Sequence, residues 1–317
     1  MRRETPAVVA MATLFVIAVL LAMLTSYILP KEYQVFGSDT ASVENSLYLF
    51  GIVIVFTIII LAIAKWGKAK LIQIIILFSV GMSVFYVANA PLLVAGYGTV
   101  LIGGVIDLAT LISAIIGFLV VLLLYTYPEW YIIDITGVIL AAGVAAIFGI
   151  SLEMSVVIIA LIIFAIYDAI SVYKTKHMVD LADNVMDLRL PVLLVIPKRL
   201  PYSFLKAKRL KLQIEDKTER EAMFMGLGDI VFPGMLVVSA LKFLPLRTTM
   251  LGINGNILVA LFTLVGCVVG FAVLMRFVLK GNPQAGLPLL NGGAIGGYIV
   301  SVLMIYGDLQ LKVPTFG

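Results

Sequence analysis

Residues 222–241 read AMFMGLGDIVFPGMLVVSAL, a stretch of about 20 residues of the length that a helix needs to cross a lipid bilayer. Its single ionisable residue is Asp229, which lies in the middle of an otherwise apolar run. An acid inside a membrane is costly unless it is paired or faces water. The stretch therefore predicts a transmembrane helix that carries a functional carboxyl group.

The rest of the chain repeats this apolar pattern. Of its 317 residues, 62% are hydrophobic and 13% are charged, whereas soluble domains have about 45–50% apolar and about 25% charged residues. Apolar runs predict nine transmembrane helices, at about 7–28, 46–64, 71–88, 99–125, 131–149, 154–173, 222–241, 256–279 and 287–306. We therefore expect an all-α polytopic membrane protein.

We expect 1–317 to form a single membrane domain in three parts. Helices one to six occupy 7–173, a basic loop occupies 174–220, and helices seven to nine occupy 221–317. The loop holds about half of the 22 Lys and Arg residues, and with nine helices it lies on the same side as Arg2 and Arg3. Because Lys and Arg favour the cytoplasmic side, the N-terminus is predicted to be cytoplasmic and the C-terminus outside.

The basic cluster at 206–211 admits a second interpretation, as a binding site for anionic lipid or nucleic acid. We interpret it as part of a cytoplasmic face that sets the topology, with no nucleic-acid partner. Within the same loop, the apolar segment 190–197 is closed by prolines and is too short to cross a membrane. It is predicted to be a small strand, an interfacial segment or the start of a re-entrant piece.

The counts of His and Cys exclude several classes of enzyme. His177 and Cys267 are the only residues of their types, so neither a two-histidine zinc protease site nor a thiolate metal cluster can form. We expect no metal and no cofactor, and any chemistry has to come from carboxylates, hydroxyls or the backbone.

Four acids lie within the predicted helices: Asp107, Asp134, Asp168 and Asp229. Asp134 is close to a helix end and is expected to reach the interface, whereas Asp107 is deeper and is expected to bond to a backbone or hydroxyl group. Asp168 and Asp229 are predicted at about 9 Å and about 11 Å from the cytoplasmic ends of consecutive, antiparallel helices. They can therefore meet, either as an aspartyl pair that activates water or as a proton or cation site of a transporter or channel.

The residues around Asp229 favour the first alternative. In a helix, Gly226 would lie one turn before Asp229 on the same face and would let a backbone or a substrate approach the acid. Pro233 would loosen the helix one turn later. The site is thus predicted to admit a polypeptide chain.

Three motifs carry a resemblance to a known family. Tyr167-Asp168, the run from Gly226 through Leu227 and Gly228 to Asp229, and a Pro-Leu element at Pro288 lie in the sixth, seventh and ninth predicted helices. Together they resemble the presenilin and signal peptide peptidase family of intramembrane aspartyl proteases. Prepilin-type peptidases share the Gly-x-Gly-Asp element but are less similar, because they lack the other two.

The resemblance implies an intramembrane aspartic endopeptidase, here a microbial, presenilin-like homologue in the cell membrane. Asp168 and Asp229 would be catalytic. The residues implied to support the site or bind substrate are Tyr167, Gly226, Leu227, Gly228, Pro288, Leu289 and Leu290. The family has Pro-Ala-Leu as its third motif, and Leu289 stands in place of Ala, a larger side chain that is expected to narrow the substrate groove.

The expected reaction is attack by water on a peptide bond of a locally unwound substrate helix. The backbone near Pro288 is expected to dock an extended substrate, with 191–197 as a second strand. The expected partners are the transmembrane helix of a protein substrate and membrane lipids. The glycine pairs at 292–293 and 296–297 are expected to serve internal contacts or a homo-oligomer.

Overall fold

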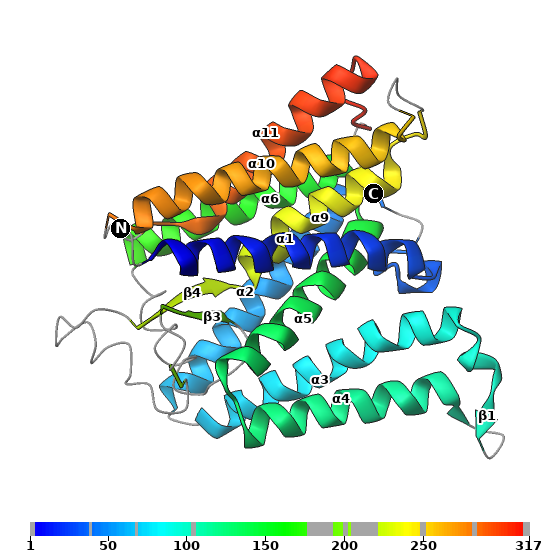
Figure 1. The fold of residues 1–317 in the computed structure, drawn as a ribbon, viewed down its shortest axis with the longest axis vertical. Coiled ribbons are helices and arrows are strands. Elements are labelled where there is room, and N and C mark those ends of the chain that lie inside the picture. The colour runs from blue at the N-terminus through cyan, green and yellow to red at the C-terminus, as the bar shows by residue number, and fades with distance from the viewer. Residues whose placement is uncertain are drawn as a thin grey trace.

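The computed structural model describes residues 4–37, 40–66, 69–102, 106–175, 193–198, 202–203, 221–247, 252–280 and 284–312. This part of the chain contains nine long helices (Figure 1). They are α1 (Thr5–Ile28), α2 (Val43–Lys65), α3 (Ala69–Val94), α4 (Leu108–Thr126), α5 (Trp130–Ser151), α6 (Met154–Ile170), α9 (Gly228–Phe243), α10 (Gly255–Val278) and α11 (Gly286–Tyr306). The predicted polytopic helical fold is confirmed.

Eight of these helices are long and apolar enough to cross a membrane. The ninth, α9, has 16 residues and rises about 24 Å. It is shorter than predicted because Ala222–Gly226 form strand β4 in place of the first turns of a helix. The prediction of helix from residue 222 is therefore wrong, since a short apolar run does not distinguish a buried strand from a buried helix.

The predicted helix at 99–125 also begins later than expected. Strands β1 (Leu101–Ile102) and β2 (Ile106–Asp107) pair before α4 starts. Asp107 is the N-cap of α4, so the prediction that it lies deep in a helix is wrong. Its carboxyl oxygens accept the backbone N–H of Thr110 at 2.8 Å and the Thr110 hydroxyl at 2.7 Å, as expected for a backbone and hydroxyl partner. These hydrogen bonds hold the pKa of Asp107 below its usual value.

Strand β3 (Leu193–Pro197) pairs with β4 in an antiparallel ribbon. Leu193 lies opposite Gly226, and Pro197 lies opposite Ala222. This confirms a strand for 193–197, whereas 190–192 and the basic cluster at 206–211 lie outside the described residues. The ribbon packs against α1 and α5, so it is attached to the helical bundle.

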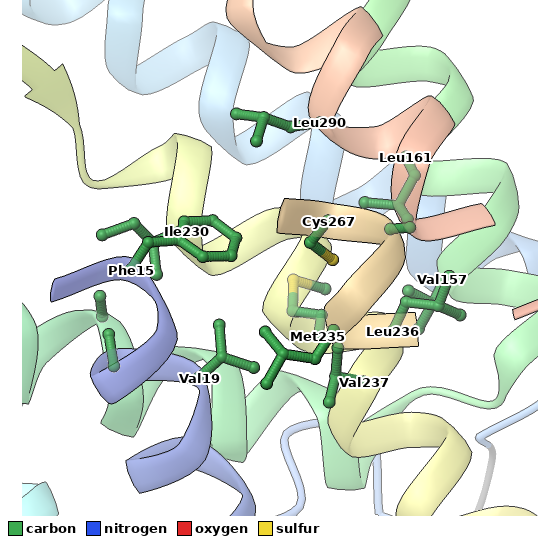
Figure 2. Close-up of a cluster of buried hydrophobic side chains, with 14 of the residues drawn as sticks. Phe15, Val19, Val157, Leu161, Ile230, Met235, Leu236, Val237, Cys267 and Leu290 are labelled. Atoms are coloured by element: carbon green, nitrogen blue, oxygen red, sulfur yellow. The ribbon is translucent and has the colours of Figure 1, made fainter. Parts of the chain in front are cut away.

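Helix α9 lies at the centre of the core. Figure 2 shows Met235, Leu236 and Val237 of α9 among side chains from α1, α6, α10 and α11. All three are buried, as are Leu161 of α6 and Cys267 of α10. The helix that carries Asp229 is therefore fixed by neighbours on several sides.

Helices α10 and α11 approach each other so closely that only glycine fits between them. A Cβ atom on Gly293 would lie 2.3 Å from the carbonyl oxygen of Gly266, and one on Gly297 would lie 2.7 Å from that of Phe262. Gly292 and Gly296 have no atom within 4 Å of such a Cβ. One glycine of each pair therefore serves an internal contact, and the other faces open space.

We predict that Gly293→Ala destabilises the protein and that Gly296→Ala, on the same helix, does not. The added methyl group at Gly293 overlaps a backbone oxygen that cannot move without shifting α10, and overpacking of this kind costs about 1–3 kcal/mol. The thermal unfolding midpoint in detergent measures the difference. Equal midpoints for the two variants would contradict this packing.

Candidate active site

Asp168 lies near the end of α6, where a π-helical turn, η3 (Ser171–Thr175), continues the helix. The side chain is buried, with 4% of its surface exposed. Its Oδ2 atom accepts the backbone N–H of Leu287 at 3.0 Å. Leu287 lies in the first turn of α11, where backbone N–H groups have no partner within the helix and where a negative charge is favoured.

Asp229 lies in the first turn of α9, directly after β4. The prediction that it lies about two turns inside a helix is therefore wrong. Gly226 is the last residue of β4 rather than part of the helix face, yet it does lie against the acid. A Cβ atom on Gly226 would be 3.5 Å from Asp229 Oδ2, and one on Gly286 would be 3.2 Å from Oδ1 and 3.3 Å from Oδ2.

Both carboxyl groups converge on the start of α11. Asp168 is hydrogen-bonded to Leu287, and Asp229 is in contact with the neighbouring residue, Gly286. The two acids are close enough to interact electrostatically. Two carboxyl groups in this relation can share one proton and act together on a water molecule.

Two stacked aromatic rings align the helices that carry the acids. Phe164 of α6 and Phe232 of α9 have ring centroids 4.1 Å apart and planes 28° apart. Phe164 lies one turn before Asp168, and Phe232 lies about one turn after Asp229, so each ring is on the same helix face as its acid. Sequence reasoning missed this pair, although the spacing of each ring from its acid was a readable signal.

The Pro-Leu element lies in the first turn of α11. Pro288 is suited to this position because the N–H that proline lacks would have no partner within the helix. The N–H of Leu287 is bonded to Asp168, so this backbone group is not free to dock a substrate. Leu289 lies with its backbone against Gly270 of α10, and Leu290 is fully buried in the core rather than lining the site.

The other expected supporting residues lie around the acids at different distances. Tyr167 is half-buried and has an edge-to-face contact with Phe50 of α2. Gly228 begins α9 and packs against the ring of Phe232. The side chain of Leu227 points toward α5, where it would be 3.1 Å from a Cβ atom on Gly137. Leu227 therefore has a packing role between α5 and the site.

Asp134 is not at the interface as predicted. It is 4% exposed, and its Oδ1 atom accepts the backbone N–H of Val195 in β3 at 2.7 Å. The prediction is wrong because β3 covers the end of α5, which sequence proximity does not reveal. Within the described residues, no group of three or more His, Cys, Asp or Glu side chains is placed to hold a metal ion.

Comparisons with known proteins agree with the motifs. The family described as signal-peptide peptidase, presenilin aspartyl protease matches residues 12–306. A solved structure of a presenilin family intramembrane aspartate protease in a C222 crystal is 35% identical, with a TM-score of 0.65 over 94% of this chain and 99% of that chain. A second structure so described, in a P2 crystal, is 35% identical, with a TM-score of 0.63 over 93% and 97% of the two chains.

No curated protein sequence matches the chain significantly. The family match covers nearly the whole chain, and each of the two structural matches covers more than nine-tenths of it. The protein is thus a multi-pass membrane protein, and it belongs to the signal-peptide peptidase and presenilin family of aspartyl proteases.

Proposed function

We propose that this protease hydrolyses peptide bonds within the transmembrane helices of membrane proteins, with Asp168 and Asp229 as its catalytic pair. The observation that carries this proposal is the convergence of the two carboxyl groups on Gly286 and Leu287. The comparisons give no support to the alternative of a transporter or channel that uses the same acids.

In the proposed reaction, one carboxylate removes a proton from a water molecule, and the oxygen of that water attacks the carbonyl carbon of the substrate peptide bond. The other, protonated acid donates its proton to the carbonyl oxygen. The tetrahedral intermediate then collapses: the C–N bond breaks as the amine nitrogen takes up a proton from one acid, and a hydroxyl group of the intermediate returns a proton to the other acid, so the pair again holds one proton. Because two adjacent carboxylates repel each other, the single proton is a property of the pair.

The substrate helix has to unwind before its peptide bonds can react, and its freed backbone groups then need new partners. Strand β4 ends at Gly226, three residues before Asp229. The outer edge of β4 can pair with an extended segment by strand addition, which would bring that segment to the acids. This edge takes over the docking role that the sequence suggested for the backbone near Pro288.

We also propose an orientation, a location and an assembly. The positive charges favour a cytoplasmic N-terminus and an outside C-terminus, with the basic loop at 174–220 on the cytoplasmic side of a single domain. We place the protein in the cell membrane of a microbe, surrounded by lipid. A homo-oligomer would need a face that the fold leaves open, such as the one with Gly292 and Gly296.

We predict that Asp168→Ala and Asp229→Ala each lower cleavage of a reporter transmembrane helix by about 1,000-fold or more, because each removes half of the acid–base pair. Asp107→Asn is the matched control. It alters an acid outside the site, and Asn caps a helix about as well as Asp does. Cleavage is measured with purified protein in bilayers, with circular dichroism as the check of folding.

Substantial cleavage by either alanine variant would overturn the catalytic assignment. Failure of the native chain to cleave any of a panel of reporter helices, together with proton or cation flux that depends on the same two acids, would favour the transporter alternative.

We also predict that Gly286→Ala lowers the cleavage rate by about tenfold or more while the fold survives. The new methyl group would lie 3.2 Å and 3.3 Å from the two carboxyl oxygens of Asp229, so the acid has to shift by a few tenths of an ångström. Rates depend steeply on such shifts, since a displacement of about 1 Å costs about 100-fold. Gly292→Ala, where a methyl group meets nothing within 4 Å, is the control. Equal kcat values for the two variants would show that the position of Asp229 does not depend on Gly286.

A further inference from the structure

The hydrogen bonds of the β3–β4 ribbon show which backbone groups face outward. In an antiparallel pair, residues that bond to the partner strand alternate with residues that point away from it. Lys198 N–H donates to the carbonyl oxygen of Glu221 at 2.8 Å, which fixes the alternation. Val195, opposite Phe224 and three residues before Lys198, therefore directs its N–H away from β4.

The outward N–H of Val195 is the one that Asp134 accepts, at 2.7 Å. Pro197, the other outward residue toward the end of β3, has no N–H to offer. An unpaired strand edge is a template for another strand. At the outer edge of β3, however, neither Val195 nor Pro197 has an N–H group left to donate to such a strand. On the opposite side of the ribbon, Phe224 points its backbone groups outward, and no described residue accepts its N–H.

Helix α5 holds the ribbon at a second point, one turn beyond Asp134. A Cβ atom on Gly137 would lie 3.0 Å from Leu194 of β3 and 3.1 Å from Leu227, the residue that joins β4 to α9. The polar contact at Asp134 and the close contact at Gly137 thus fix β3, and the residue that follows β4, against α5. Because β4 continues through Leu227 to Asp229, the position of the ribbon is coupled to that of the acid.

An acid at this place needs an explanation, since a buried carboxyl group in a membrane protein costs several kcal/mol and an apolar side chain would fill the space more cheaply. We propose that Asp134 is a positioning residue that closes the outer edge of β3 and fixes the register of the ribbon. An extended substrate then has one edge to pair with, that of β4 beside Asp229. The role of the substrate in this proposal rests on the proposed function, whereas the hydrogen bond between Asp134 and Val195 is independent of it.

The first experiment compares Asp134→Leu, which removes the acceptor at similar volume, with Asp134→Asn, which keeps an acceptor oxygen without the charge. For Asp134→Leu we expect KM for the reporter helix to rise about tenfold, and cleavage to spread to positions two residues from the native one, as a register slip requires. Asp134→Asn should restore the native KM and the single cleavage position. Native KM and position in Asp134→Leu would overturn the proposal, as would an Asn variant that behaves like the Leu variant.

A double-mutant cycle with Val195→Pro separates this role from a general loss of packing. Proline removes the same N–H from the other side of the bond and is accepted where a strand N–H points outward. We expect Asp134→Leu to have little further effect on KM and cleavage position once Val195 is Pro, because there is no donor left to satisfy. Additive effects would show that Asp134 does not act through this hydrogen bond.

Amide hydrogen exchange of the full chain in bilayers provides a readout that does not need activity. Asp134→Leu should speed the exchange of the Val195 amide and of the paired amides in β4, and Asp134→Asn should not. Unchanged exchange in Asp134→Leu would overturn the role of Asp134 and leave the catalytic pair untouched. Loss of exchange protection in a protein that never cleaves the reporter would support the contact and contradict the proposed function instead.

Discussion

The whole site depends on one constraint, that two carboxyl groups have to be held together inside a membrane protein. The start of α11 meets this constraint, because a helix N-terminus offers free N–H groups and a favourable place for negative charge. Asp168 takes the N–H of Leu287, and Gly286 leaves room for the Asp229 carboxyl beside it. The three helices α6, α9 and α11 therefore have to meet at one point.

The packing of the bundle holds these three helices together near the acids. The stacked rings of Phe164 and Phe232 fix α6 against α9 next to the acids. On the other side, Gly266 and Gly293 let α10 and α11 pack at backbone distance, and the amide of Asn291 donates to the carbonyl oxygen of Leu161 to join α11 to α6 at 2.9 Å. These contacts lie within two turns of the acids, so the site is built into the core rather than added to its surface.

The sequence predicted the parts of this structure that depend on composition and spacing. Nine apolar runs predicted nine long helices, and the two acids at matching depths indicated a pair. It did not predict β4, because Ala222–Gly226 are apolar enough for either a helix or a strand. The sequence also did not predict the role of Asp134, because its partner, Val195, is 61 residues away and no local pattern indicates so distant a contact.

The replacement of helix by strand before Asp229 matters for function. Had 222–227 been helical, Asp229 would lie in a helix interior, where every neighbouring N–H is already bonded and no backbone edge is open. With β4 in that place, Asp229 lies in the first turn of α9, where the helix dipole favours a negative charge. The same strand offers an edge to an unwound substrate a few residues away. One short change of secondary structure thus provides both a favourable place for the acid and a surface for the chain that it is proposed to cleave.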